Sequence, residues 1–486
     1  MMSAPAPWGK IDVREASIEF LQAAQGDLGL TARGLVQAYL ARIDTYDKRG
    51  PVINSVLRVN PHALQQADEL DRERYAIGPR GPLHGIPVLV KDNFETVDMP
   101  TSMGSIVFKD FHPCRDGFQV RRLKQAGAII LGKTTMHELA MGVTNASSLS
   151  GYTRNPYVLN RVPGGSSGGT GAAVAASFAT VGMGSDTAGS IRIPAANQAL
   201  VGLRPTTGLS SRSGVVPLSH TQDVVAPLAR CVEDLAIMLD ATVGEDSEDA
   251  STQCLNERRA SLCYRQRLRD DVIPSLSVGV LRDLFGDEPE DAEVTEIIDH
   301  ALSMLKHHGA ALHPIRLKNL DALIEASNVI RHEFKRDFAI YLSSFRQAPV
   351  HSLDEFAALN AHHQEIGQPL SNRLIDSTEA DRAAALEARQ QLRDLVERTM
   401  SKSGFDVLVY PVMRRKACLI GTAQLGVNAQ LSAGSGLPAI SIPAGLAKDG
   451  TPIGMEFLAC AFQEQHLLNL AYSWQKIRPI RDRPDF

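Results

Sequence analysis

Short, wholly apolar runs alternate with amphipathic stretches along this chain. Residues 13–45 and 61–75 carry apolar side chains three and four positions apart among charged ones, which predicts outer helices. The apolar runs 86–90 and 128–132 are typical of buried strands, and the segment 119–126 between them is amphipathic. This alternation predicts an α/β fold whose core is a mixed, mostly parallel sheet covered by helices on both faces.

The same pattern continues to the end of the chain. Strands are predicted at 201–204, 277–281, 406–411, 439–443 and 453–458. Helices are predicted at 232–240, 294–307, 322–345, 378–400 and 464–474. Thr135 and Glu138 have the spacing of a capping box and predict one more helix after residue 135. Because no linker separates two cores, residues 1–486 are predicted to form one large domain.

Charge and cysteine content exclude several classes of protein. The 50 basic and 55 acidic residues are well mixed and give a net charge of −5, so neither nucleic acid nor an anionic membrane is an expected partner. The six cysteines form no CxxC pair, which favours reduced thiols. Residues 1–10 lack a signal-peptide pattern, and no apolar run could span a bilayer. We therefore expect a soluble, cytoplasmic protein.

The candidate chemistry lies between Gly164 and Pro194. Ser166 and Ser190 both occur in glycine-rich surroundings, where the backbone can turn tightly and present N–H groups to a small anion. A serine nucleophile needs a base, and no histidine triad is recognisable. Lys91 directly follows the apolar run 86–90: such a lysine usually reaches water, but a buried one has a lowered pKa and can act as a base. On the residues alone, both serines remain candidate nucleophiles.

Cofactor and metal chemistry find no support in the sequence. The loop 165–171 lacks the Gly-Lys-Ser/Thr ending of a P-loop, and no G-x-G-x-x-G follows a strand, so no nucleotide cofactor is expected. Ser190 does not lie in a G-x-S-x-G elbow. The histidine pairs 307–308 and 362–363 are adjacent residues in helical settings and point in different directions, so no metal site is predicted.

Several separated motifs together resemble one protein family. The matching segments are residues 85–92, 164–169, 186–194, 202–208 and 219–223, with weaker matches at 436–439 and 452–454. They resemble the amidase signature family, which includes fatty acid amide hydrolase, malonamidase, peptide amidase and the A subunit of the tRNA-dependent glutamine amidotransferase. The resemblance implies the amidase signature fold, with its core at about residues 80–245 and the part 246–486 completing the sheet and the substrate pocket.

The resemblance also assigns roles to the candidate residues. It implies that Ser190 is the nucleophile, Ser166 a bridging serine after a cis peptide bond, and Lys91 the base. It further implies an oxyanion hole formed by the backbone N–H groups of Thr187, Ala188, Gly189 and Ser190. Ala188 stands where many relatives have glycine. The implied reaction is hydrolysis of carboxylic amides, and in some members of esters or carbamates, through an acyl-enzyme.

Two alternative functions, the substrate and the oligomeric state stay open at this point. One alternative is the glutaminase A subunit, but its usual Met-Asp-Glu-Phe-Ala-Met-Gly-Ser differs from the segment 136–143. The other is an inactive scaffold, which the presence of all three reacting residues disfavours. The substrate is an expected small-molecule amide, ester or carbamate of neutral acyl or aryl type, and a homodimer is left open. The candidate substrate-binding residues are Met141, Gly142, Val143, Thr144 and Asn145, with Met103 and the segment 419–436 as further candidates.

Overall fold

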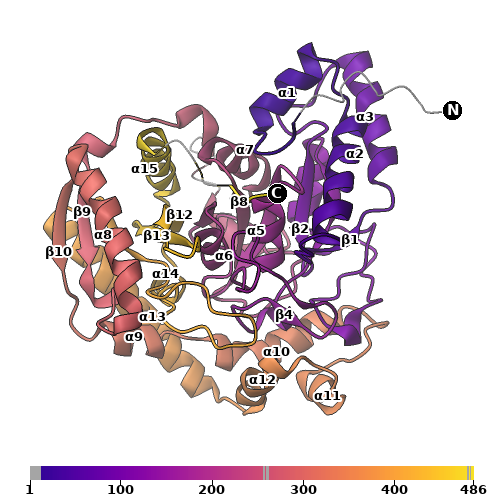
Figure 1. The fold of residues 1–486 in the computed structure, drawn as a ribbon. Coiled ribbons are helices and arrows are strands. Elements are labelled where there is room, and N and C mark those ends of the chain that lie inside the picture. Colours follow the sequence, from indigo (N-terminus) through magenta and orange to yellow (C-terminus); the bar gives the residue numbers. More distant parts are fainter. Residues whose placement is uncertain (1–11, 256–257, 259–261, 479–480, 482) are drawn as a thin grey trace.

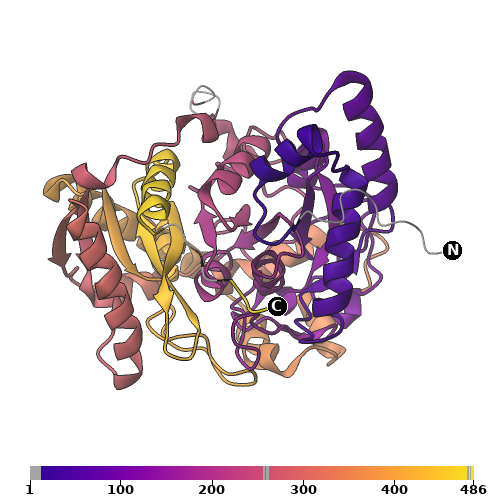
Figure 2. The same ribbon diagram turned by 45° about the horizontal axis from the view of Figure 1, so that its top comes forward.

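One mixed β-sheet of eleven strands runs through the molecule, with the order β1-β3-β2-β6-β8-β7-β12-β13-β11-β9-β10 (Figures 1 and 2). The computed structural model describes residues 12–255, 258, 262–478, 481 and 483–486. The strands of the sheet are β1 (Val56–Val59), β2 (Pro87–Lys91), β3 (Ile129–Thr134), β6 (Val181–Asp186), β7 (Val201–Arg204), β8 (Val224–Ala229), β9 (Ser277–Leu281), β10 (Ala311–Ile315), β11 (Val407–Pro411), β12 (Ala439–Leu446) and β13 (Pro452–Leu458). A small separate hairpin pairs β4 (Ala146–Ser147) with β5 (Gly151–Tyr152).

Helices flank this sheet, as the sequence predicted. They are α1 (Ile18–Asp27), α2 (Ala32–Arg42), α3 (Ala63–Ile77), α4 (Phe118–Gln125), α5 (Gly168–Ala175), α6 (Arg192–Asn197), α7 (Val232–Thr242), α8 (Ala292–His307), α9 (Leu320–Ala326), α10 (Ile330–Ser343), α11 (Leu353–Ala358), α12 (Gly367–Leu374), α13 (Glu379–Ser403), α14 (Gln430–Ser435) and α15 (Glu464–Ile477). The crossovers β2-α4-β3 and β3-α5-β6 run in opposite directions along the sheet, so right-handed connections place α4 and α5 on opposite faces.

The strand directions correct one prediction. Parallel ladders join β2 to β3 and β6 on one flank, and β9 to β10 and β11 on the other. The centre, from β6 through β8, β7, β12 and β13 to β11, is antiparallel, so the sheet is mixed but not mostly parallel. Helical crossovers produce parallel pairs, whereas the short link between β12 and β13 permits only an antiparallel hairpin. The strands beyond residue 246 lie in the same sheet as the earlier ones.

Two predicted helices differ in the structure. The helix expected after Thr135 is wrong: Glu138–Ala140 forms only a short 3-10 turn, and Leu139 has a φ of 50°. The carboxylate of Glu138 accepts hydrogen bonds from Ser148 and from the backbone of His363, so it does not complete a capping box. The helix expected at 322–345 is two helices, α9 and α10, because the side chain of Asn328 accepts from the N–H of Ile330 and starts the second.

A second hydrophobic cluster lies outside the main core and includes side chains of α10, α11 and α12, which belong to the orange segment in Figure 1. Phe334 and Phe338 of α10 pack there with Phe108, and Met141 and Leu218 belong to the same cluster. This segment therefore packs on loops that follow the sheet strands.

Candidate active site

Lys91 is the last residue of β2 and is fully buried. Its Nζ donates hydrogen bonds to Ser166 Oγ at 2.7 Å and to Ser185 Oγ at 2.9 Å. Asn93 donates from Nδ2 to the same Ser185 oxygen at 3.0 Å. Because β2 and β6 are parallel neighbours, Lys91 and Ser185 come from the carboxyl ends of adjacent strands. The sheet thus brings the predicted base to the predicted bridging serine.

The electrostatics of this position suit proton transfer. Burial lowers the pKa of Lys91 to about 7, and the carboxylates of Asp186 and Asp223 limit that fall. A lysine with such a pKa is substantially unprotonated at neutral pH, so it can accept a proton. Of the two interpretations that the sequence left open, the structure supports the buried amine.

Ser166 lies in a tight segment just before α5. The Gly165–Ser166 peptide bond is cis, as the resemblance implied. A Cβ at Gly165 would lie 2.9 Å from the carbonyl carbon of Val143, and one at Gly168 would lie 2.6 Å from Cγ of Asn145. Asn145 Oδ1 accepts from the N–H of Gly168 at 3.0 Å. Glycine is therefore required where this segment meets the loop 141–145.

Ser190 belongs to the turn that follows β6. Asp186 holds this turn by accepting from the N–H groups of Gly189 at 2.8 Å and Ile191 at 3.1 Å. The N–H of Ser167 donates to the Ser190 carbonyl at 3.1 Å, which ties the two serine segments together. Within the described residues, the Ser190 hydroxyl hydrogen-bonds neither Lys91 nor Ser166, and Ser190 is 6% exposed. The Ser190 segment thus lies beside the Ser166 segment, and the pair leaves the Ser190 hydroxyl unbonded.

The backbone donors of this turn differ in their availability. In the part of the chain that the structure describes, the N–H groups of Thr187, Ala188 and Ser190 donate to no protein acceptor, whereas Gly189 donates to Asp186. Gly189 has a φ of 108°, and a Cβ there would lie 2.4 Å from that of Ala429. Three of the four predicted oxyanion donors are therefore free to bind an oxygen.

A buried charge network supports the turn from below. Arg192 and Arg204 both donate to Asp186, and Arg192 also donates to Glu456 at 2.6 Å. Burial alone would raise the pKa of Asp186, but the two guanidinium groups hold it well below its usual value. Tyr410 donates to Glu456 at 2.7 Å. Asp186 and Arg192 thus organise the loop that carries Ser190.

The segment 219–223 fixes the turn from the side. Gln222 Nε2 donates to the carbonyl of Thr187 at 2.7 Å, and Thr187 Oγ1 donates to Asp223 at 2.5 Å. Asp223 also accepts from the backbone N–H of Leu218 at 2.8 Å. These contacts orient the peptide that carries the free N–H groups.

The predicted substrate-binding loop packs against this centre. Met141 is buried in the second hydrophobic cluster, and Val143 packs near Ile193. Gly142 lies against the ring of His137, where a Cβ would approach within 2.4 Å. Thr144 donates to Glu365, which also accepts from Tyr152 at 2.6 Å. The side chain of Asn145 bonds Thr135, Thr153 and Gly168, so the protein itself satisfies it.

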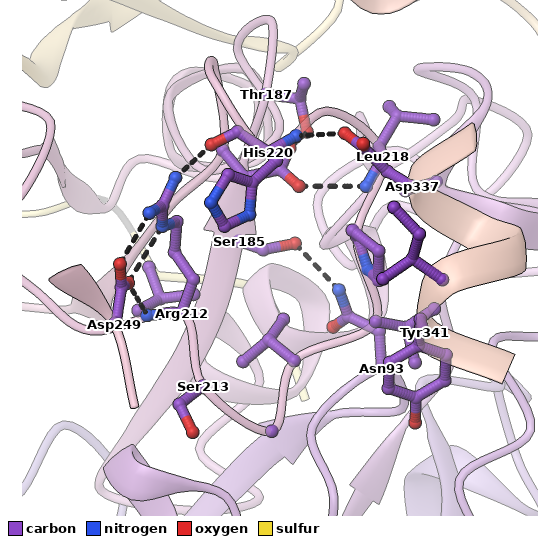
Figure 3. Close-up of a pocket in the computed structure, with 18 of the residues that line it drawn as sticks. Asn93, Ser185, Thr187, Arg212, Ser213, Leu218, His220, Asp249, Asp337 and Tyr341 are labelled. Carbon is purple, nitrogen blue, oxygen red and sulfur yellow. Dashed lines mark hydrogen bonds and ion pairs between the residues drawn. The ribbon is translucent and has the colours of Figure 1, made fainter. Parts of the chain in front are cut away.

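A cavity of about 460 Å³ lies between the loop 212–223 and α10, beside the candidate catalytic cluster formed by Lys91, Ser166, Ser190 and their neighbours (Figure 3). It reaches the cluster at Asn93, Ser185 and Thr187, while Lys91, Ser166 and Ser190 are not part of its lining. Sequence reasoning missed Ser185 and Asn93 as site residues. Their signal was position: Asn93 is two residues after Lys91, and Ser185 directly precedes Asp186.

Other kinds of site find no support in the described structure. Nowhere in the described ranges do three or more His, Cys, Asp or Glu side chains gather closely enough to hold a metal ion. All six cysteines are free thiols. Within the same ranges, every helix is too short or too polar to traverse a lipid bilayer.

Comparison with known proteins agrees with this geometry. Residues 34–468 match the family model described as Amidase. A probable amidase of Arabidopsis thaliana is 31% identical over 98% of this chain and 92% of its own length. The A subunit of the glutamyl-tRNA(Gln) amidotransferase of Halorhodospira halophila is 34% identical over 92% of this chain and 94% of its own length. The crystal structure of the peptide amidase from Stenotrophomonas maltophilia superposes with a TM-score of 0.89, at 36% identity, over 97% of this chain and 99% of that one. The chain therefore belongs to the amidase family.

Proposed function

We propose that this protein hydrolyses the C–N bond of linear carboxylic amides through an acyl-enzyme on Ser190. The observation that carries the proposal is the buried Lys91, whose pKa is lowered to about 7 and whose Nζ lies 2.7 Å from Ser166 Oγ. A neutral amine next to a hydroxyl can relay a proton from a nucleophile that it does not itself touch. The free N–H groups beside Ser190 supply donors for an oxyanion.

The proposed reaction has two halves. Ser190 Oγ attacks the carbonyl carbon, its proton passes to Ser166 Oγ, and the proton of Ser166 passes to Lys91. The carbonyl oxygen becomes an oxyanion held by the N–H groups of Thr187, Ala188 and Ser190. The C–N bond then breaks as Ser166 protonates the leaving nitrogen and recovers a proton from Lys91. Water then attacks the Ser190 ester and gives its proton through Ser166 to Lys91, and the relay returns that proton to Ser190 Oγ as the carboxylic acid leaves.

The substrate class follows from the surroundings and the relatives. The likeness to a peptide amidase favours a stand-alone amidase. Action on small-molecule amides in the cytoplasm is part of the same proposal. Esters and carbamates share the carbonyl chemistry, so the proposal extends to both. The second candidate is a glutaminase A subunit of an amidotransferase, which the likeness to the Halorhodospira halophila protein favours. Purified chain that hydrolyses simple amides but not glutamine would separate the two.

The test combines covalent labelling with turnover. A fluorophosphonate probe is expected to label the wild-type protein at Ser190, and Ser190→Ala should abolish both labelling and amide hydrolysis. Lys91→Ala and Ser166→Ala should each lower kcat/KM by about 10²-fold or more, since each interrupts general base catalysis. Undiminished hydrolysis by Lys91→Ala would contradict the relay.

A matched control keeps loss of the fold apart from loss of chemistry. Lys133 is also a fully buried lysine at the end of a strand, but it bonds the Phe94 carbonyl at 2.7 Å and Asp92 rather than a serine. Lys133→Met is expected to lower the melting temperature. Its labelling per folded molecule should persist. If Lys91→Ala and Lys133→Met lowered the melting temperature alike and both retained labelling per folded molecule, Lys91 would have only a structural role.

A further inference from the structure

We propose that the cavity beside the catalytic cluster holds the amine half of the substrate and selects uncharged, largely apolar amines. This inference rests on the proposed amide hydrolysis. It assigns the cavity to the nitrogen side of the scissile C–N bond and to uncharged amines as leaving groups. The cavity has room for an aromatic or short aliphatic amine, since its volume is about 460 Å³.

The position of the proton relay carries the first step. In the proposed reaction Ser166 protonates the leaving nitrogen and recovers its proton from Lys91, so the nitrogen lies on the side of the segment where Lys91 bonds Ser166 and Ser185. Ser185, which accepts a hydrogen bond from Lys91 at 2.9 Å, is part of the cavity wall. On the Gly165 side of the Ser166 segment the loop 141–145 leaves no room even for a Cβ, which would lie 2.9 Å from the carbonyl carbon of Val143. The nitrogen therefore faces the cavity.

An unpaired polar group in the cavity wall supports the same orientation. Asn93 is 2% exposed and donates from Nδ2 to Ser185, and in the described structure its Oδ1 has no hydrogen-bond partner. Figure 3 shows this oxygen turned away from Ser185, among the residues of the cavity. A buried acceptor without a partner is costly, so the N–H of a bound amide has a ready partner here.

Most arginine side chains around the cavity are paired with neighbouring carboxylates. Arg212 forms a double ion pair with Asp249, on the left in Figure 3. Arg336 donates to Asp337, whose other oxygen accepts from the backbone of His220 at 2.7 Å.

The remaining charged groups of the lining add no free cation. Arg115 pairs with Glu95, and Asp223 accepts from Thr187 and two backbone N–H groups. Among the described residues, the carboxylate of Glu248 accepts a hydrogen bond from Ser213 and forms no ion pair. A carboxylate on the amine would find no free arginine among the described lining residues and would meet Glu248, so anionic amines are disfavoured.

Apolar side chains provide the rest of the surface. Val215, Val216 and Leu218 come from the loop, and Ile340 and Tyr341 come from α10. Ile340 lines the cavity and is 60% exposed, so it stands at the mouth of the cavity. A bulkier side chain at Ile340 can narrow the mouth without entering a packed core.

The test varies the two halves of the substrate separately. The amine series keeps one acyl group and compares the primary amide, the anilide and the 4-carboxyanilide. The acyl series keeps aniline and changes the acyl group. The wild type should prefer the anilide over the 4-carboxyanilide in kcat/KM by about tenfold or more, the range that one mismatched group produces in a specificity pocket.

Two exposed isoleucines provide matched variants. Ile340→Trp should lower the kcat/KM ratio of anilide to primary amide by about tenfold, and should leave the acyl series in its original order. Ile375→Trp, at a position that is 68% exposed and outside the cavity, should change neither series. A change in the acyl series alone, or an unchanged amine ratio, would overturn the assignment.

Binding of the product amine separates this inference from the proposed function. Saturation-transfer NMR should detect aniline on the wild type and on Ile375→Trp, with a weaker signal on Ile340→Trp. If the protein hydrolysed no amide while aniline still bound in this pattern, the proposed reaction would fail and the amine site would stand. Absence of aniline binding together with hydrolysis of amides would refute the amine site alone.

Discussion

Among single residues, Lys91 shows how burial decides between two interpretations of the same sequence. A lysine at a strand end is ordinary, and only its enclosure by β2, β6 and the Ser166 segment lowers its pKa. The residues that complete its surroundings, Ser185 and Asn93, were not predicted, because only their position in the sequence pointed to the site. The strand 181–186 that carries Ser185 contains small residues and gives no apolar run, so its pairing with β2 emerges only in the fold.

The pH dependence of activity is a prediction at this scale. Lys91 must be neutral to act as base, and its pKa is lowered to about 7 by burial. We therefore expect kcat/KM to be low below pH 6, to rise with an apparent pKa of about 7, and to level off at higher pH. This course follows the unprotonated fraction of Lys91. The measurement is a pH profile with a neutral anilide.

The direction of the shift in the Lys91 pKa can be checked independently. A base with an ordinary lysine pKa of about 10.4 would move the rise more than three units higher. Chemical rescue of Lys91→Ala by an added amine should shift the acid limb to follow the pKa of that amine. A limb that stays in place in the rescued variant would assign it to another group.

At the scale of elements, the long periodic or apolar segments were predictable and the glycine-rich ones were not. The predicted strands at 201–204 and 277–281 agree with β7 and β9. Helix α5 was not predicted, since its first residues are glycines that lie against backbone and its amphipathic pattern is absent. The capping box predicted at Thr135 does not form, because the side chains of Thr135 and Glu138 hydrogen-bond Thr153 and Ser148 instead. Local patterns fail where backbone approach, rather than side-chain burial, forms the element.

Two glycines in helices make this difference measurable. A Cβ at Gly169 in α5 would lie 2.3 Å from the carbonyl oxygen of Thr135, whereas one at Gly26 in α1 would meet nothing within 4 Å. Gly169→Ala should lower the free energy of unfolding by about 1–3 kcal/mol and reduce probe labelling of Ser190. Gly26→Ala should raise the free energy of unfolding by about 0.4–1 kcal/mol and leave labelling unchanged. Urea titration and the labelling rate provide the two readouts, and equal effects of the two substitutions would refute the close-packing argument.

At the scale of the whole molecule, the sheet and the α10–α12 segment have separate hydrophobic clusters. The sheet could be predicted as α/β from its alternating elements. The attachment of α10–α12 over the site could not, since it depends on long-range contacts such as Thr144 and Tyr152 with Glu365. One wall of the cavity comes from α10 and the other from loops of the sheet. The stability of the α10–α12 segment therefore affects the cavity more than it affects the candidate catalytic cluster around Lys91.

This division predicts local rather than global effects of a substitution in the second cluster. Phe338 is fully buried, and its ring lies 6.0 Å from that of Phe108 and 5.3 Å from that of Phe334. Phe338→Ala should cost about 3–5 kcal/mol, the usual cost of removing a buried phenylalanine side chain. Because this cluster is separate from the main core, hydrogen exchange should accelerate in α10–α12 while β2 and β6 keep their protection. The fluorophosphonate should still label Ser190, whereas KM for the anilide should rise as the wall formed by α10 loosens. Uniform loss of protection across sheet and segment would instead show that the two clusters unfold as one unit, and the pocket would then be no more adjustable than the site it serves.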